Sequence, residues 1–383
     1  MRVQKYGIDC SRGVLNRGNL YRIERAMRKA MRGEAINVGF LGGSITQGCL
    51  SSTPETCYAY LVYRWWCQKF PEAAVTYVNA GIGGTTSQFG VARADSDLLS
   101  KEIDFTVVEF SVNDKDNEHF LETYEGLIRK IYSYRTKPAI LIVNSVYYSD
   151  GANAQVQHIK IGRAYDLPCV SMKPTLYEKV LDGTYTSRDV TADDLHPNDE
   201  GHGLMAEVII GFLEMVYEEL QSGNEAKDNH LEIQKIVPVT QNAYENSIRY
   251  QNDNCENVMV ENEGFTADKQ PQNDIREIFR RGWIADKKGA HIGFHIEGSC
   301  IGVQYRKSVV KPTCVARAVV DGDTDNAVIL DGNFEESWGD NLQLDTIAEH
   351  LPYGKHYVEI ELIETHEDDK VPFYLVSIIG SGL

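Results

Sequence analysis

Residues 36–48, which read INVGFLGGSITQG, place an apolar run directly before two glycines and a serine. The run at 38–41 has the length and composition of a strand that is buried on both faces of a parallel sheet. Gly42 and Gly43 permit a sharp turn, and Ser44 follows where the strand would lead into a helix. Open α/β folds bind their ligands at this carboxyl end of the sheet. The stretch therefore predicts an α/β fold in which Ser44 is a candidate nucleophile.

Apolar runs alternate with helical patterns through the first part of the chain. The runs typical of buried strands lie at 38–41, 75–79, 104–112, 139–146 and 168–172. The helical patterns lie at 19–32, 58–70, 88–100, 118–134, 153–166 and 199–221. Strict alternation of strands and helices is the signature of a doubly wound parallel sheet in three layers.

The pattern changes after residues 222–229, which read SGNEAKDN and have the small, polar composition of a linker. Short β-like runs separated by turn residues follow at 231–239, 291–296, 300–305, 315–320, 327–330, 357–363 and 373–379. Regular short strands of this kind predict an antiparallel sandwich or jelly roll. We therefore expect an α/β domain at residues 1–222 and an all-β domain at 230–383.

Three later motifs carry polar residues at the ends of predicted strands or just before a predicted helix. Residues 79–87 read NAGIGGTTS, residues 109–114 read EFSVND and residues 193–198 read DDLHPN. Because the carboxyl ends of parallel strands share one edge of a sheet, these motifs and Ser44 are expected to converge there.

Ester cleavage by a serine requires a base, because the hydroxyl alone is a weak nucleophile. His196 is the candidate base, since histidine titrates near working pH. An aspartate that contacts the far ring nitrogen would fix the tautomer and stabilise the imidazolium. Asp193 can reach that nitrogen across one tight turn, and Asp194 competes with it on chemistry alone.

With Ser44, the three motifs resemble the four sequence blocks of the SGNH, or GDSL-type, hydrolases, which supply serine, glycine, asparagine and histidine in this chain order. The resemblance covers residues 36 to about 215 and implies a flavodoxin-like α/β fold. The family pattern places the catalytic aspartate three residues before the histidine, which selects Asp193. The resemblance also implies an oxyanion hole made by the backbone N–H groups of Ser44 and Gly84 and the side-chain amide of Asn113. No metal or cofactor is expected.

Two further features imply a subgroup that acts on carbohydrate. Gly43 stands where the founding motif has aspartate, as in the variant found among carbohydrate acetylesterases. An SGNH domain joined to a jelly-roll domain is similar to the bacterial two-domain acetyl xylan esterases. The resemblance implies an enzyme that removes acetyl groups from xylan-derived oligosaccharides through a Ser-His-Asp mechanism.

The β-domain offers one candidate sugar subsite. Residues 335–350 are expected to form a long loop that clusters Trp338, Asp340, Asn341 and His350, with Trp338 and His350 as possible substrate-binding residues. The alternative is a surface loop with one packed tryptophan. The domain is also expected to narrow the active site or to assemble subunits into a homo-oligomer.

Two other functions compete with this one. An SGNH lipase or acyl thioesterase would act on longer acyl esters, and the absence of a hydrophobic lid-like helix near Ser44 disfavours it. A carbohydrate-binding protein with an inert SGNH domain is disfavoured because all four motif residues are intact. Comparing the hydrolysis of acetyl and octanoyl esters would separate the first alternative from the acetylesterase.

Composition limits the partners and the compartment. The formal net charge of −18 argues against nucleic acid or an anionic membrane surface. The eight cysteines show neither zinc-ligand spacing nor the density of a disulfide scaffold, so reduced thiols are expected. The start of the chain lacks the apolar segment of a signal peptide, which predicts a cytoplasmic enzyme.

Overall fold

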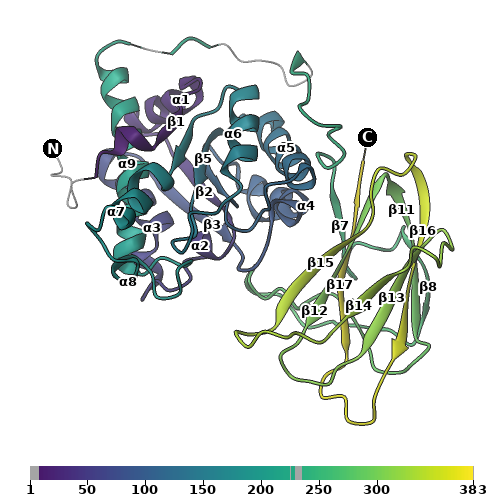
Figure 1. The fold of residues 1–383 in the computed structure, drawn as a ribbon. Helices are drawn as coiled ribbons and strands as arrows, with labels where there is room; N and C mark the ends of the chain where they lie inside the picture. The colour runs from purple at the N-terminus through teal and green to yellow at the C-terminus, as the bar shows by residue number, and fades with distance from the viewer. Residues whose placement is uncertain (1–7, 225, 229–234, 383) are drawn as a thin grey trace. The chain divides into compact units, whose positions relative to one another are not determined.

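The chain forms two compact units, Met1–Gln241 and Asn242–Leu383. The computed structural model describes residues 8–224, 226–228 and 235–382. The first unit combines a sheet with helices, and the second is built from strands (Figure 1). The predicted linker at 222–229 lies before the division between the units, and its residues 225 and 229 lie outside the described part of the chain.

A six-stranded sheet with the strand order β1-β6-β5-β4-β2-β3 forms the centre of the first unit. Neighbouring strands from β2 to β6 are parallel, and β1 pairs antiparallel with β6. The parallel strands follow the flavodoxin-like order, which confirms the predicted doubly wound sheet. The strands are β1 (Val14–Asn16), β2 (Ile36–Gly42), β3 (Val75–Gly81), β4 (Phe105–Glu109), β5 (Ala139–Asn144) and β6 (Cys169–Ser171).

Two groups of helices cover the two faces of this sheet (Figure 1). One group contains α1 (Tyr21–Met31), α3 (Tyr58–Lys69) and α9 (Asp199–Gln221). The other contains α4 (Ser87–Asp97), α5 (Glu118–Ser133) and α6 (Gln155–Ala164). The fully buried Trp66 of α3 lies against the sheet, with its ring centroid 5.3 Å from that of Phe105, so it belongs to the core. The short helices are α2 (Ser44–Gln47), α7 (Glu178–Leu181) and α8 (Ser187–Val190).

The second unit is a sandwich of two antiparallel sheets. One sheet has the order β15-β12-β17-β10-β9, with β7 also paired to β17, and the other has the order β14-β13-β16-β11-β8. Buried side chains from both sheets, such as Phe294 and Leu375, form one core between them, which confirms the predicted all-β sandwich. The strands are β7 (Ile248–Tyr250), β8 (Met259–Glu263), β9 (Thr266–Ala267), β10 (Trp283–Ala285), β11 (His291–Gly298), β12 (Cys300–Lys307), β13 (Val315–Val320), β14 (Val328–Asp331), β15 (Asn341–Ala348), β16 (Gly354–Glu364) and β17 (Phe373–Ser381).

Two local predictions for the residues after the predicted linker were wrong. Residues 235–239 form no strand, and the rest of the run predicted at 231–239 lies outside the described residues. The loop predicted at 335–350 contains strand β15, which pairs with β12. Leu342 and Leu344 alternate with polar residues there, which is the two-residue period of a strand. The loop interpretation overlooked this period because the polar residues dominate the composition.

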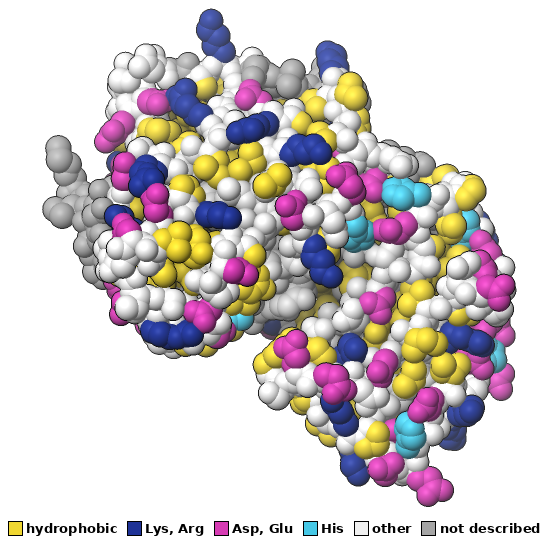
Figure 2. All heavy atoms as spheres, in the orientation of Figure 1, with side chains coloured by type: hydrophobic (Ala, Val, Ile, Leu, Met, Phe, Trp, Pro, Cys, Tyr) yellow, Lys and Arg dark blue, Asp and Glu magenta, His cyan; other side chains and the backbone are white. Residues whose placement is uncertain are grey.

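The surface of the molecule carries charges of both signs. On the face shown in Figure 2, acidic side chains are interspersed with lysines and arginines over both units. The eight cysteines are free thiols, and Cys49 and Cys67 are the partly exposed ones. A search of the described helices finds none with the length and apolar character of a membrane span.

Candidate active site

The predicted motifs meet at one edge of the parallel sheet. Gly42 at the end of β2 is in register with Gly81 of β3 and Glu109 of β4. The loops that leave these three strands therefore begin at the same level of the sheet. They flank the point where the strand order reverses, which is where ligands bind in doubly wound folds.

Ser44 is held at this edge by a turn that needs glycine. It is the first residue of α2 and is 9% exposed. A Cβ atom at Gly42 would lie 2.2 Å from Thr46 Oγ1 and 2.4 Å from the Glu109 carbonyl oxygen. No side chain fits at position 42, so glycine is required where the strand passes into the turn that presents Ser44.

His196 connects the Ser44 hydroxyl to Asp193. The His196 Nε2 atom lies 2.8 Å from Ser44 Oγ, and its Nδ1 atom lies 2.6 Å from Asp193 Oδ2. Both distances are those of hydrogen bonds. The structure thus brings together the three residues predicted to be catalytic, although 152 positions separate Ser44 from His196.

The loop before α9 distinguishes the two neighbouring aspartates. Asp193 Oδ1 accepts hydrogen bonds from the backbone N–H groups of Leu195, at 3.0 Å, and His196, at 2.7 Å. Asp194 has a φ of 65° and pairs with Arg188 at 2.6 Å. The carboxylate of Asp193 therefore faces the imidazole, while that of Asp194 faces an arginine.

The electrostatic environment favours the charged forms of both members of the pair. Burial acts to lower the pKa of His196, but hydrogen bonds and charge from Cys49 and Asp193 outweigh it and raise this pKa to about 9. Burial acts to raise the pKa of Asp193, but its hydrogen bonds to His196 and Leu195 outweigh burial, so this pKa is lowered. The pair is thus arranged to stabilise an imidazolium.

In the glycine loop after β3, the N–H groups of Gly81 and Gly83 are bound by side chains, and that of Gly84 is not. The Gly81 N–H donates to Asn79 Oδ1 at 2.9 Å, and the Gly83 N–H donates to Gln47 Oε1 at 2.6 Å. The Gly84 N–H has no hydrogen-bond partner among the described residues, and Gly84 has a φ of 68°. This loop therefore offers Gly84, the residue predicted for the oxyanion hole, as a free donor.

The side chain of Asn113 lies directly beside the nucleophile turn. A Cβ atom at Gly43 would lie 2.3 Å from Asn113 Oδ1 and 3.2 Å from its Nδ2. Aspartate at position 43 would displace this amide, which gives a physical reason for the glycine found here. The amide is thus held against the residue that precedes Ser44.

Comparisons with known proteins identify the family of this chain. Residues 40–204 match the GDSL-like lipase/acylhydrolase family. A crystal structure of a two-domain esterase active on acetylated mannans is 56% identical, with a TM-score of 0.93 over 98% of this chain and 99% of that one. The chain belongs to the GDSL-like lipase/acylhydrolase family. The family resemblance deduced from the four motifs is therefore confirmed.

A second structure of that esterase and one further relative extend the comparison of this GDSL-like hydrolase. The same two-domain esterase co-crystallised with mannopentaose gives the same identity, coverage and TM-score. An acetylxylan esterase from Geobacillus stearothermophilus is 27% identical over 133 residues, which are 29% of this chain and 60% of that protein. The matched segment thus spans less than two thirds of the acetylxylan esterase.

The GDSL-like unit contains supporting residues that the sequence analysis missed. Asp114 Oδ1 accepts from the Ser87 N–H at 2.9 Å, and its Oδ2 lies 3.1 Å from Nε2 of the buried His158. The Asn113–Asp114 turn is thereby fixed to the start of α4 and to α6. The only sequence signal for Asp114 was its place beside Asn113, and His158 carried none.

His202 and Asp199 connect α9 to the chain that follows the nucleophile. His202 Nδ1 accepts from the Tyr58 N–H at 3.4 Å, and its Nε2 donates to the Cys49 carbonyl at 3.3 Å. Burial lowers the pKa of His202 to about 4, so this ring is neutral at pH 7. Asp199 accepts from the N–H and hydroxyl of Ser52. The helix that follows His196 is therefore tied to the segment that follows Ser44.

The candidate sugar-binding residues of the β-unit do not form one cluster. Trp338 lies before β15 and is 60% exposed, and its ring packs against Phe334. His350 lies beyond the other end of this strand, and its backbone N–H donates to Cys300. A strand of eight residues separates the two side chains. Asp340, from the same segment, binds the Ser308 hydroxyl at 2.9 Å.

A search of the described residues for three or more His, Cys, Asp or Glu side chains able to hold a metal ion finds none. The two histidines at this edge of the sheet already have hydrogen-bond partners on both ring nitrogens. The His196 ring lies between Ser44 and Asp193, and the His202 ring lies between the backbones of Tyr58 and Cys49.

Proposed function

We propose that this protein is a serine esterase that removes acetyl groups from carbohydrate. The observation that carries this proposal is the continuous hydrogen-bonded chain from Asp193 through His196 to Ser44. Ser44 has the place of the nucleophile, His196 that of the general base and Asp193 that of the group that orients the base. The membership of the GDSL-like family supports the same chemistry.

In the proposed reaction, Ser44 Oγ attacks the carbonyl carbon of the acetyl group while His196 Nε2 accepts the hydroxyl proton. The tetrahedral oxyanion is bound by the N–H groups of Ser44 and Gly84 and by the Asn113 amide. The intermediate then releases the sugar oxygen, which takes the proton from His196, and leaves an acetyl-serine. Water, deprotonated by His196, hydrolyses this ester to acetate, and Ser44 recovers its proton.

Acetylated mannans are the substrates that the comparisons favour. The two-domain esterase active on acetylated mannans is 56% identical and aligns with 98% of the chain, so the likeness includes both units. The acetylxylan esterase is 27% identical over 29% of the chain. Acetylated xylo-oligosaccharides, the substrate first expected from the sequence, are the second candidate.

Acetate release from the two acetylated substrates tests this proposal. We expect a higher kcat/KM on acetylated manno-oligosaccharides than on acetylated xylo-oligosaccharides. We also expect faster hydrolysis of p-nitrophenyl acetate than of the octanoyl ester. Preference for the octanoyl ester would favour the lipase or thioesterase alternative, and binding of mannan without acetate release would favour a carbohydrate-binding protein.

Removing the Asn113 amide is expected to lower kcat. Loss of one oxyanion donor typically costs about 10²- to 10³-fold in kcat, so we expect a loss of this order in N113A. The control is N144A, because Asn144 is another asparagine at the end of a parallel strand, is buried and donates from its side chain to the Val170 carbonyl. Steady-state kinetics of both variants should show the large loss only for N113A, and an equal loss in both would contradict the proposed role.

The activity is expected to rise with pH through the neutral range. His196 must be neutral to accept the Ser44 proton, and its pKa is raised to about 9. Below that pH, kcat/KM should fall by about tenfold for each pH unit, because the imidazolium cannot act as a base. The measurement is kcat/KM for p-nitrophenyl acetate from pH 6 to 10, corrected for spontaneous hydrolysis.

Replacement of Cys49 tests the origin of this pH dependence. Cys49 helps to raise the pKa of His196. In C49A the inflection should therefore move to lower pH, whereas C67A, which removes the other partly exposed cysteine, should leave it in place. An inflection that stays unchanged in C49A would show that the thiol does not affect His196.

A further inference from the structure

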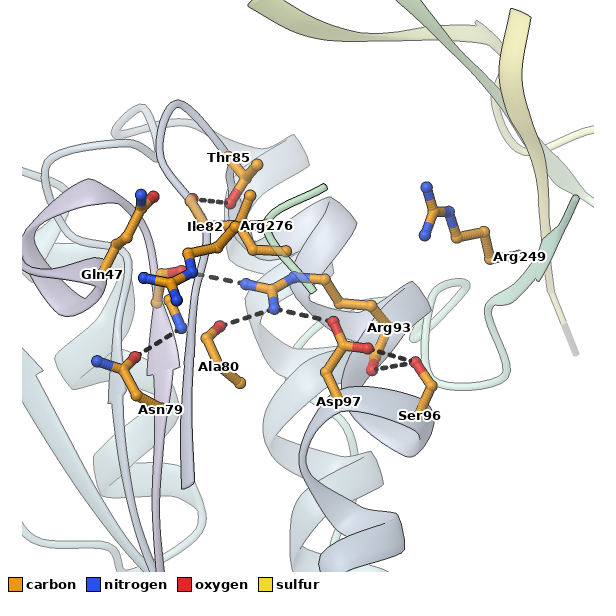
Figure 3. A network of polar contacts seen from close by, with 12 residues as sticks. Gln47, Asn79, Ala80, Ile82, Thr85, Arg93, Ser96, Asp97, Arg249 and Arg276 are labelled. Carbon is orange, nitrogen blue, oxygen red and sulfur yellow. Dashed lines mark hydrogen bonds and ion pairs between the residues drawn. The ribbon is translucent and has the colours of Figure 1, made fainter. Parts of the chain in front are cut away.

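Arg93 places a buried cation beneath the edge of the sheet that carries Ser44. It lies on α4, and its side chain is 0% exposed. Its Nη1 atom donates to the Ala80 carbonyl at 2.7 Å, and its Nη2 atom donates to the Gly42 carbonyl at 3.1 Å. Figure 3 shows the guanidinium between Ala80 and Asp97, whose carboxylate is 3.2 Å away. A buried charge is costly unless it is paired and hydrogen-bonded, so these contacts explain how Arg93 is tolerated.

The two carbonyl groups belong to the strands that carry the proposed catalytic donors. Gly42 is the last residue of β2 and lies two positions before Ser44, while Ala80 lies in β3, four positions before Gly84. The Gly42 carbonyl also accepts from the Ile82 N–H at 3.1 Å. Arg93 therefore bridges the ends of two adjacent strands just where each leaves the sheet.

Other contacts join the same two loops, and these are neutral. Asn79 Nδ2 donates to the Thr46 carbonyl at 2.8 Å, and Gln47 Oε1 accepts from the Gly83 N–H. Within the loop after β3, Thr85 Oγ1 also donates to the Ile82 carbonyl at 2.6 Å (Figure 3). These bonds fix the loops locally, whereas the planar guanidinium of Arg93 binds carbonyl groups of both strands beneath them.

We propose that Arg93 is a positioning residue for ester hydrolysis. By holding the Gly42 and Ala80 carbonyls together, it keeps the N–H groups of Ser44 and Gly84 at the spacing that one oxyanion requires. The inference rests on the proposed function, since it assumes that Ser44 is the nucleophile. Because these donors bind the oxyanion more strongly than the ground-state ester, loss of Arg93 should lower kcat and leave KM nearly unchanged.

The test compares R93M with R22M. Arg22 is also buried, and its Nη1 atom donates to two backbone carbonyls, those of Tyr132 and Pro138, at 3.0 and 3.2 Å. Pro138 lies just before β5, at the opposite end of the parallel strands from Ser44. R22M therefore removes a similar clamp without touching the proposed active site, and both variants should lower the thermal unfolding midpoint.

We expect R93M to lower kcat for p-nitrophenyl acetate by roughly 10- to 100-fold, because small misplacements of catalytic groups have effects of this size. Its KM and the pH of its inflection should stay unchanged, since Arg93 neither binds substrate nor contacts His196. R22M should keep kcat within about twofold of the native value. Equal losses of kcat in R93M and R22M, or a native kcat in R93M, would overturn the inference.

A second variant covers the case in which R93M does not fold. R93K keeps a buried cation but lacks the planar fork that binds two carbonyls at once. We expect it to fold and to have a kcat between those of the native enzyme and R93M, and a native kcat in R93K would also overturn the inference. If S44A keeps esterase activity, the proposed function itself fails. If S44A is inactive and both Arg93 variants have native kcat, only the inference about Arg93 fails.

Discussion

Ser44→Ala is expected to lower kcat for acetate release by roughly 10⁴- to 10⁶-fold, the range found when a serine nucleophile is removed from a catalytic triad. The variant removes the Oγ atom that lies 2.8 Å from His196 Nε2 and leaves the backbone donor of Ser44 in place. No acetyl-enzyme can then form. The measurement is acetate release from acetylated manno-oligosaccharides, with p-nitrophenyl acetate as a second substrate.

Two further variants make this result specific. H196A should cost nearly as much as S44A, and the double variant should cost little more than either, because the two side chains act as one unit. S51A is the control, since Ser51 Oγ donates to the Gly48 carbonyl near the same turn and takes no part in the proposed reaction. Substantial esterase activity in S44A would show that the hydrolysis occurs elsewhere and would revive the binding-protein alternative.

The architecture of the first unit could be predicted because its sequence periods are strong. Apolar runs such as 139–146 and the helical pattern at 199–221 leave few alternatives to a parallel sheet covered by helices. The second unit was less predictable, because strands β7, β9 and β10 have only two or three residues. Segments this short carry no periodic signal, and their pairing depends on long-range contacts.

The candidate site shows the same division between local and long-range information. Ser44, Asn113 and His196 lie in short motifs at the ends of predicted elements, so the sequence could indicate them. Asp193 and Asp194 could not be separated by chemistry, because the choice depends on the left-handed backbone conformation of Asp194. Arg93 was missed because an arginine in a helix usually lies on the solvent face, and its burial depends on the strands packed against it.

Asp193→Asn is expected to lower kcat by about 10⁴-fold, as replacement of the triad aspartate does in other serine hydrolases. Asp193 Oδ2 accepts a hydrogen bond from His196 Nδ1–H, which keeps the proton on Nδ1 and leaves Nε2 free to accept the Ser44 proton. An asparagine amide at this position can donate to Nδ1, which would favour the tautomer that carries its proton on Nε2. The imidazole would then face Ser44 with a donor and could not act as the base.

The neighbouring aspartate supplies a matched control, because D194N makes the same chemical change one residue away. It weakens a surface ion pair with Arg188 and keeps the Asp194 carbonyl that accepts from the Tyr148 N–H at 2.7 Å. D194N should therefore keep kcat within about twofold of the native value. D193N should also move the inflection of kcat/KM to lower pH, since Asp193 helps to raise the pKa of His196. Similar losses in D193N and D194N, without this movement, would mean that the loop conformation rather than the carboxylate facing the imidazole determines the rate.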